Sequence, residues 1–284
     1  MKFFLFYVIG ILPLIFVGCD LNNSCELNEQ NYNGLGLFSV SSTQTVTFSP
    51  GNLQYHPMKK KWRFAEKQTD YIGYANSNIS STYNGWIDLF GWSTTSNYFG
   101  VSKSRDGNDY SGSFVDWGIN KIGKDVPHTW RTLSRDEWMY IFCHRPNAEF
   151  LFGCGNVNGI NGIIILPDNW DQPNDLSFVA SVTKGLDWHG SGYYNSKADN
   201  YEHNTYTFEQ WLKMEQLGAV FLPASGARIH TDVYAIYYDG YCWSSTEYND
   251  NYAYYILFGL RRFGPQDNYF TRDYGFPVRL VKDL

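Results

Sequence analysis

Two stretches of the chain place apolar residues at helical spacing directly after a capping box. In TLSRDEWMYIFCHR, Ser134 stands three positions before Glu137, and an apolar series at helical spacing follows. In TYTFEQWLKMEQLGA, Thr207 and Gln210 repeat the capping pattern, and Gly218 is placed to end the helix. The pattern therefore predicts two helices.

The remaining apolar segments are short and show either the alternation or the dense apolar runs of β-strands. They are TQTVTFSPG, KWRFAE, GIIILP, GAVFLPASG, AYYILFG and GFPVRLV. In AYYILFG, alternation predicts that Tyr254, Ile256 and Phe258 face one way and that Tyr255 and Leu257 face the other.

Because strands and helices do not alternate regularly, we expect an α+β fold rather than an α/β fold.

The longest apolar run, residues 3–17, follows Lys2 and is too short to span a bilayer comfortably. Gly18 and Cys19 at its end resemble a bacterial lipoprotein signal. We therefore expect residues 1–18 to be a cleaved lipoprotein signal peptide and Cys19 to be lipidated, since several acyl chains anchor a protein stably. An ordinary secretory signal followed by an incidental cysteine is the alternative.

The rest of the chain divides into a tether and a domain. Residues 19–35 are rich in Asn, Glu and Gln and read as a flexible tether, whereas residues 36–284 can bury the core of one domain. The formal net charge is −6 at pH 7, so a nucleic-acid partner is not expected, because such surfaces are basic. The expected membrane contact is the N-terminal lipid anchor.

Cysteine usage gives no sign of a metal site. Beyond Cys19, the chain contains Cys25, Cys143, Cys154 and Cys242, without a CxxC pair or a His and Cys cluster at zinc-ligand spacing. We predict no metal-binding residues on this basis. In an exported protein Cys143 and Cys154 can oxidise together, and the sequence leaves that pairing open.

Seven segments in order carry a resemblance to a known family. They are GNLQYHP with WRFAEKQTDYIG, GWIDLFGWST, TWRTLSRDEWMYIF, GIIILPDNW, GAVFLPASGAR, CWSSTE and GFPVRLV. Together they resemble secreted Bacteroidetes proteins of the Fibrobacter succinogenes major domain type, over residues 36–284. The resemblance implies a C-type-lectin-like fold of the formylglycine-generating-enzyme variety, with small twisted antiparallel sheets, two helices and long irregular loops.

The same resemblance bears on catalysis. Its enzymatic members act through two reactive cysteines near the C-terminus, whereas Cys242 is the one cysteine of this chain beyond residue 154. We therefore expect a protein that is not an enzyme, and a Cys242 that behaves as a small buried hydrophobe. Asp187 and His189 lie in a Gly-rich segment without an evident nucleophile, so we name no catalytic residue.

Calcium is the one cofactor that the resemblance leaves to consider. Calcium-dependent lectins of this fold use a Glu/Gln-Pro-Asn/Asp loop and a nearby Trp-Asn-Asp strand. The segments QPND (172–175) and YND (248–250) resemble these two motifs but lie far apart in the chain. Asn and Asp in such loops commonly form turns, which is the alternative interpretation.

Residues 234–255 contain eight tyrosines among Asn, Asp and Ser. Tyrosine supplies a large contact area at low entropic cost, and the short polar residues supply adaptable hydrogen bonds, as in antibody paratopes. We therefore expect a ligand-binding surface within residues 225–274, at 228–240, 248–252 and 261–274. The candidate contact residues are His230, Tyr234, Tyr237, Tyr238, Asp239, Tyr248, Asn249, Asp250, Asn251, Tyr252, Arg261, Arg262, Phe263, Asp267, Asn268, Tyr269, Phe270, Arg272, Asp273 and Tyr274.

A second resemblance concerns the same region. Domains of this variety serve as variable proteins of diversity-generating retroelements, in which adenine randomisation of Asn codons cannot create Lys, Glu, Gln, Met or Trp codons. These five types make up 43 of the 284 residues, yet residues 225–274 contain three of them: Trp243, Glu247 and Gln266. The depletion favours a diversified receptor, and ordinary loop composition is the alternative.

Together these patterns predict an outer-membrane or cell-surface lipoprotein that binds a protein or glycan through its C-terminal loops, as a receptor or adhesin. Two other classes stay open. One is a formylglycine-generating-like or glycan-modifying enzyme, and the other is a fimbrial or surface structural subunit. Comparison of loop codons among close relatives separates them, because diversification concentrates changes at adenine-derived codons.

Acylation of Cys19 is directly testable. We expect the protein to remain in the membrane fraction after a high-salt wash, and Cys19→Ala to release it, because the acyl chains supply the membrane affinity. Fractionation followed by immunoblotting measures the distribution. Equal membrane retention of the Cys19→Ala protein would contradict the lipoprotein prediction.

Overall fold

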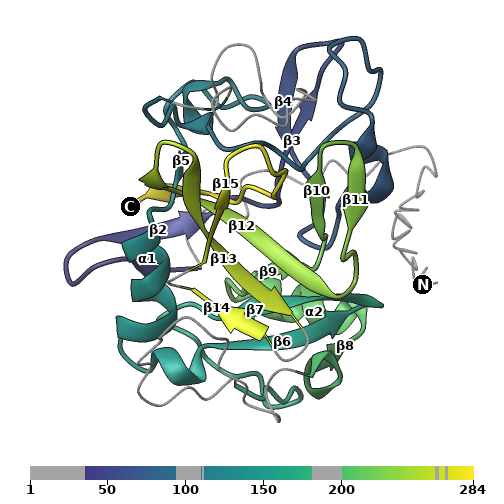
Figure 1. Cartoon of the computed structure of the whole chain (residues 1–284). Coiled ribbons are helices and arrows are strands. Elements are labelled where there is room, and N and C mark those ends of the chain that lie inside the picture. The colour runs from purple at the N-terminus through teal and green to yellow at the C-terminus, as the bar shows by residue number, and fades with distance from the viewer. Residues whose placement is uncertain (1–35, 94–109, 111, 181–199, 260–261, 266–267) are drawn as a thin grey trace, which may run out of the picture. The chain divides into compact units, whose positions relative to one another are not determined.

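Strands outnumber helices, which confirms the α+β class (Figure 1). The computed structural model describes residues 36–93, 110, 112–180, 200–259, 262–265 and 268–284, all within one compact unit, Gly34–Leu284. The predicted signal peptide, the tether with Cys19 and Cys25, and the Asp187 and His189 segment lie outside the described residues. Over the described ranges, no helix is long and apolar enough to cross a membrane.

The first predicted helix begins as expected but does not stay α-helical. In α1 (Arg135–Met139), Ser134 is the N-cap, and it forms both hydrogen bonds of the capping box with Glu137. The chain then continues as a π-helical turn, η5 (Tyr140–His144). Arg145 follows, and its Nε donates to a carbonyl of that turn at 2.6 Å. Helical spacing over so few residues does not distinguish a π turn from an α turn, so the pattern predicted one continuous helix.

The second predicted helix is confirmed as α2 (Phe208–Gln216). Thr207 and Gln210 form its capping box. Gly218 follows it with a φ of 91°, a left-handed conformation that glycine adopts without strain and that ends the helix. The short 3₁₀ turns are η2 (Gly73–Ser77), η4 (Trp117–Ile119), η6 (Ala148–Phe150) and η7 (Tyr201–Asn204).

Among the described residues, the strands form three four-stranded sheets and two hairpins. The first sheet has the order β1 (Phe38–Ser39), β2 (Thr45–Phe48), β16 (Leu280–Asp283) and β5 (Arg131–Thr132). The second has the order β8 (Thr205–Tyr206), β6 (Phe152–Val157), β7 (Ile160–Ile165) and β9 (Val220–Pro223). In the third, β13 (Tyr252–Gly259) lies between β12 (Asp239–Asn249) on one side and β14 (Arg262–Gly264) and β15 (Tyr269–Thr271) on the other. The hairpins are β3 (Leu53–His56) with β4 (Lys61–Phe64), and β10 (Ala227–Ile229) with β11 (Asp232–Tyr234).

Five of the six predicted strand segments contain a strand at the expected place. The sixth, GFPVRLV, does so at its end, where β16 begins at Leu280. Its first residues form isolated bridges instead, Gly275 with Arg228 and Phe276 with Phe90. Pro277 has no N–H to donate, so a regular ladder cannot continue through it.

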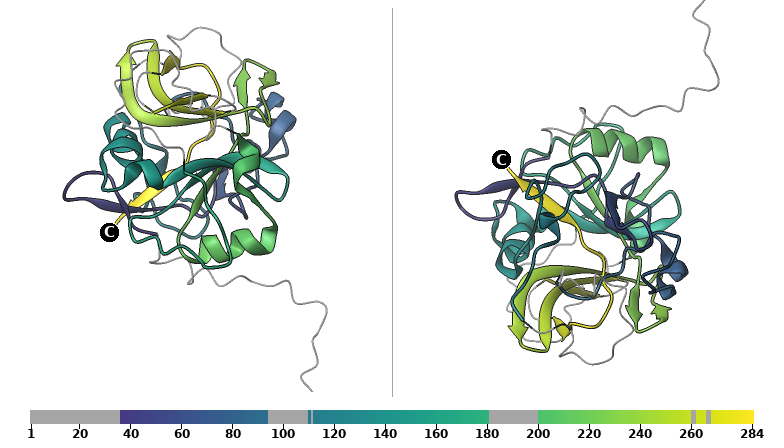
Figure 2. Two further views of the ribbon diagram at one scale, coloured as in Figure 1. Left: turned by 90° about the horizontal axis from the view of Figure 1, so that it is seen from below. Right: turned by 90° about the horizontal axis from the view of Figure 1, so that it is seen from above.

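The second and third sheets divide the interior into layers. Helix α2 packs on one face of the second sheet, where Trp211 and Phe221 share a core. The opposite face contributes Ile163 to a central core, which also contains Ile256 of β13. The far face of β13 contributes Tyr255 to a further core. The views in Figure 2 accordingly show α2 and the yellow-green strands on opposite sides.

The alternation predicted for β13 is therefore confirmed where the strand is buried. Ile256 and Phe258 belong to the central core. Tyr255 and Leu257 pack in the core on the other face. This strand separates two cores and contributes side chains to both, so both of its faces are apolar between Tyr255 and Phe258.

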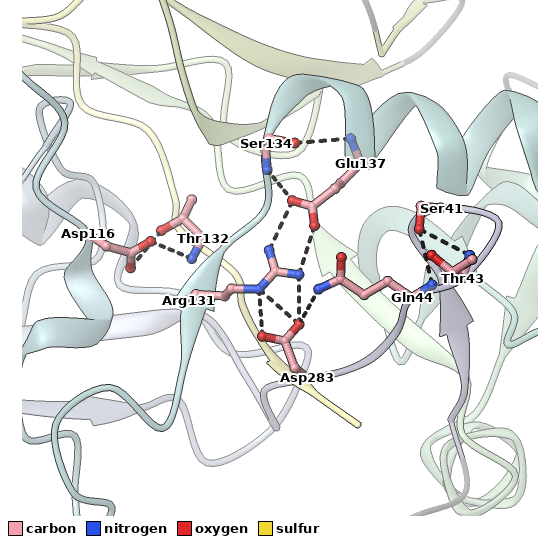
Figure 3. Close-up of polar contacts among 9 residues, drawn as sticks. All are labelled: Ser41, Thr43, Gln44, Asp116, Arg131, Thr132, Ser134, Glu137 and Asp283. Carbon is pink, nitrogen blue, oxygen red and sulfur yellow. Dashed lines mark hydrogen bonds and ion pairs between the residues drawn. The ribbon is translucent and has the colours of Figure 1, made fainter.

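An ion-pair network links β5, β16 and α1 at the edge of the first sheet (Figure 3). Arg131 in β5 contacts Asp283 in β16 at 2.8 Å and Glu137 in α1 at 2.7 Å. Asp283 also accepts a hydrogen bond from the Gln44 side chain at 2.8 Å. The carboxylate of Glu137 thus serves both the capping box and Arg131, which fixes the start of α1 against the sheet.

The capping box predicts a measurable loss of stability. Ser134→Ala should reduce the free energy of unfolding by about 1 kcal/mol, because the Glu137 N–H loses its acceptor. Ser42→Ala, at an exposed position outside the helices, should change it by less than about 0.5 kcal/mol. Urea denaturation measures both values, and equal effects would show that the cap contributes nothing specific.

Candidate binding surface

Four tyrosines of the predicted surface, all in segments rich in Asn, Asp or Gly, are exposed. The exposed fractions are 50% for Tyr237, 68% for Tyr238, 45% for Tyr248 and 42% for Tyr269. Their Asn, Asp and Gly neighbours had indicated this exposure. Trp243, in the same region, is fully buried, as expected of a strand residue.

These tyrosines do not form one surface. Tyr237 and Tyr238 precede the start of β12, and Tyr248 lies near its end. A strand rises about 3.3 Å per residue, so the two groups are separated by about 30 Å along the strand. The predicted segments 228–240 and 248–252 therefore lie toward opposite ends of β12 and do not form one continuous patch.

At the far end of β12, four rings form what we call the tyrosine cluster: Tyr248, Tyr252, Tyr254 and Tyr269. Tyr248 and Tyr269 stack face to face, with ring centroids 3.8 Å apart and an interplanar angle of 2°. Tyr252 stands perpendicular to Tyr269 at 5.8 Å, and Tyr254 stands perpendicular to Tyr248 at 5.5 Å. Edge-to-face and stacked contacts both stabilise aromatic groups, so the cluster holds its shape.

Strand register explains how the cluster forms. Tyr254 and Tyr269 are directly opposed on β13 and β15. The pairing of β12 with β13 is irregular between Trp243 and Asn249, and an irregularity of this kind re-aims side chains. Tyr248 comes from the strand on the other side of β13, so the stacked pair spans the central strand. Sequence alternation alone did not reveal this arrangement.

Helix α1 borders the cluster, which sequence analysis missed. The Arg135 guanidinium lies 4.9 Å from the centre of the Tyr254 ring. The backbone N–H of Arg135 donates to the Thr246 hydroxyl of β12 at 3.0 Å, which ties the start of the helix to the sheet. The first residue of α1 therefore forms part of the surface.

Arg272 is not a surface residue, contrary to prediction. It is 0% exposed, and its guanidinium lies over the Trp92 ring at 4.3 Å. Its Nη2 donates to the carbonyl of Asn249 at 2.5 Å and contacts the Glu247 carboxylate at 3.1 Å. Arg272 therefore holds the end of the β12–β13 hairpin from beneath, because its guanidinium donates to a carbonyl at the turn.

Other predicted contact residues are buried as well. Phe263 belongs to the central core, and Asp273 lies beneath the surface with its carboxylate 3.7 Å from His230. Arg228, within the predicted range 228–240, is fully buried and donates to the carbonyl of His230 at 2.6 Å. These positions were misjudged because Arg, Asp and Phe occur in paratopes and in cores alike, and composition does not separate the two.

The remaining candidates are divided between the two ends of β12. Asn249, Asp250 and Asn251 form the exposed hairpin turn next to the cluster, where Asn249 Oδ1 accepts from the Tyr252 N–H at 3.0 Å. Half-buried candidates are His230, Tyr234, Asp239, Tyr252, Asn268, Phe270 and Tyr274. Arg261 and Asp267 lie outside the described residues, and of Arg262 only the strand position in β14 is described.

The second exposed group lies beside η2. Tyr237 has a φ of 72° and contacts the Tyr71 ring edge-to-face at 6.2 Å. Its N–H donates to the Ala224 carbonyl at 2.9 Å, and the Tyr201 hydroxyl donates to the Tyr238 carbonyl at 2.8 Å. These bonds offset the left-handed backbone at Tyr237 and fix the loop.

Among the described cysteines, the pairing of Cys143 with Cys154 that the sequence left open is not formed, because Cys143 is a free thiol. Cys242 is buried in the central core, and burial raises the pKa of its thiol to about 12. A reactive cysteine needs the opposite shift, because the thiolate is the nucleophile.

The two calcium-like segments have other roles. Asp175 of QPND forms an ion pair with Lys213. The YND segment belongs to β12 and its turn, and Asn249 caps that turn with its own side chain. Throughout the described ranges, no three His, Cys, Asp or Glu side chains gather as metal ligands would.

A shallow groove of about 590 Å³ adjoins the cluster through Arg135. It runs along α1 and the π turn, with Tyr140 and His144 on one side and Ser41 and Gln44 on the other. π turns often occur at functional sites. The sequence held no signal for it, because the groove forms between segments about 95 residues apart.

Comparisons with known proteins do not identify the chain. No family model matches it, and neither the curated proteins nor the solved structures contain a match.

The exposed tyrosines and the buried tryptophan should respond oppositely to truncation. The combined variant Tyr237→Ala, Tyr238→Ala, Tyr248→Ala, Tyr269→Ala should fold with a melting temperature close to the parent's, since exposed substitutions change stability by about 0.5 kcal/mol or less each. Trp243→Ala should cost about 3–5 kcal/mol, because it removes a fully buried side chain. Calorimetry measures both. An unfolded quadruple variant would place these rings in the core instead.

Proposed function

We propose that this protein is a non-catalytic, surface-exposed lipoprotein that binds a protein or glycan ligand through its tyrosine cluster. The observation that carries the proposal is the stacked pair of Tyr248 and Tyr269, which is about half exposed on a sheet whose other face is packed. Exposed aromatic side chains on a rigid support are common anchors of interfaces. Contact of such apolar ring faces with water does not stabilise the protein, whereas a ligand that covers them does.

The support beneath the cluster favours binding over a purely structural role. Arg272 fixes the hairpin turn, and Arg135 packs on Tyr254 from the side. The rings are therefore ordered before a ligand arrives, which lowers the entropic cost of association. An adhesin or receptor benefits from such preorganisation.

The proposal includes the C-type-lectin-like fold and, with it, the lipid anchor at Cys19. The two helices, the small sheets and the long connections agree with that fold at the level of class. The rival proposal of a formylglycine-generating-like enzyme needs a reactive thiol, and the raised pKa of Cys242 opposes this. In a fimbrial subunit the same tyrosines would contact a neighbouring copy of the chain.

Retroelement diversification is a further part of the proposal. It fits best at the exposed positions of the hairpin, Tyr248 and 249–251, where side-chain changes leave the cores intact. The buried residues Arg272 and Phe263 would have to stay constant within the same region.

A glycan and protein array tests the proposed function. The Gly34–Leu284 unit should bind a subset of features, and the pair Tyr248→Ala, Tyr269→Ala should lose most of that binding, because aromatic anchors dominate interfaces. The matched control is Tyr237→Ala, Tyr238→Ala, which removes two exposed tyrosines at the other end of β12. Equal loss in both variants, or none in either, would contradict binding at the cluster.

A further inference from the structure

The tyrosine cluster already accommodates one cation of the protein itself. The guanidinium of Arg135 lies 4.9 Å from the centre of the Tyr254 ring, within the range of a cation–π interaction. Tyr252 stands two residues along the same strand and presents its ring on the same face of the sheet. The face that attracts Arg135 therefore continues toward the hairpin turn.

Exposed carboxylates lie at two edges of this aromatic face. Asp250 is exposed in the turn between Tyr248 and Tyr252, whereas Glu247, opposite Ala253, pairs with Arg272 on the other face of the sheet. On the opposite side, Asp136 is 89% exposed next to Arg135. The chain as a whole carries a formal charge of −6, so both the local and the global fields favour an incoming positive charge.

The phenol of Tyr269 stays uncharged. A hydrogen bond with Tyr248, followed by the proximity of that phenol, raises the pKa of Tyr269 above its usual value. An uncharged phenol keeps the negative ring face that attracts cations, without the salt sensitivity of a full charge. The cluster thus has a defined chemistry, which is an aromatic surface within an acidic border.

We propose that the tyrosine cluster binds arginine or lysine side chains of a protein partner, with a guanidinium or ammonium group on the exposed ring faces and the acidic border around it. This inference rests on the proposed function and narrows its ligand class. Neutral glycans also stack on aromatic rings, but they gain nothing from the charge of Asp250. The acidic border therefore favours the basic protein segment.

Peptide binding tests the inference. The probe is a fluorescent Gly-Ser peptide with three arginines, and its counterpart replaces each arginine with citrulline, which has nearly the same shape and no charge. Fluorescence anisotropy with the Gly34–Leu284 unit should show that the arginine peptide binds about threefold to tenfold more tightly than the citrulline peptide. The difference should shrink as salt is raised, because screening weakens exposed charge pairs.

Variants locate the site. Tyr252→Ala should weaken arginine-peptide binding by about threefold or more, whereas Tyr252→Phe should retain most of it, because phenylalanine keeps the ring face. Asp250→Asn should weaken binding, and Asp232→Asn, an exposed aspartate in the β10–β11 hairpin, should not. Circular dichroism checks that each variant is folded.

Four outcomes test this inference and its relation to the proposed function. Equal affinity for the arginine and citrulline peptides would overturn the inference, as would equal effects of Asp250→Asn and Asp232→Asn. If glycans on the array bind through Tyr248 and Tyr269 while the arginine peptide does not, the inference fails and the proposed function stands. If no tyrosine variant changes any binding, both fail.

Discussion

Burying arginine against main-chain carbonyls is the interaction on which this loop-rich fold depends. Packed loops leave carbonyl groups that no sheet partner satisfies, and a guanidinium offers five donors in a fixed plane. Arg145, Arg228, Arg272 and Arg279 are each at most 2% exposed, and each donates to at least one carbonyl. Burial lowers the pKa of Arg279 to about 10, so the group still carries its charge at neutral pH. The charge and the carbonyls stabilise each other, since either alone would be costly to bury.

Two of these arginines connect parts of the chain that lie far apart in sequence. Arg279 joins the end of the first sheet to the second, because its guanidinium donates to the carbonyls of Ser49 and Phe221. Arg272 joins the β12–β13 hairpin to the segment around Gly112, 160 residues earlier. The tyrosine cluster lies on the hairpin that Arg272 holds. The order of its rings therefore depends on the buried charge of Arg272.

Local signals in the sequence were sufficient for where the helices begin and for the exposure of particular tyrosines. Capping boxes at Ser134 and Thr207 act over three residues, so they are visible without tertiary information. Burial of Arg272 was not visible, because its acceptors come from distant segments. The separation of Tyr237 from Tyr248 was also hidden, since it depends on the length of β12 and on which connections leave each end. The role of Arg135 depended on the helix docking against β12, which no local pattern encodes.

The position of β13 between two cores has a consequence for how the molecule comes apart. Loosening either core exposes one face of this strand, so the free energy of one core is linked to that of the other. The amides of β13 should then exchange with solvent only when the whole unit opens, and slowly. Loops at either end of β12 can open on their own, while β13 stays packed. The loop residues can therefore vary while the interior still unfolds as one cooperative unit.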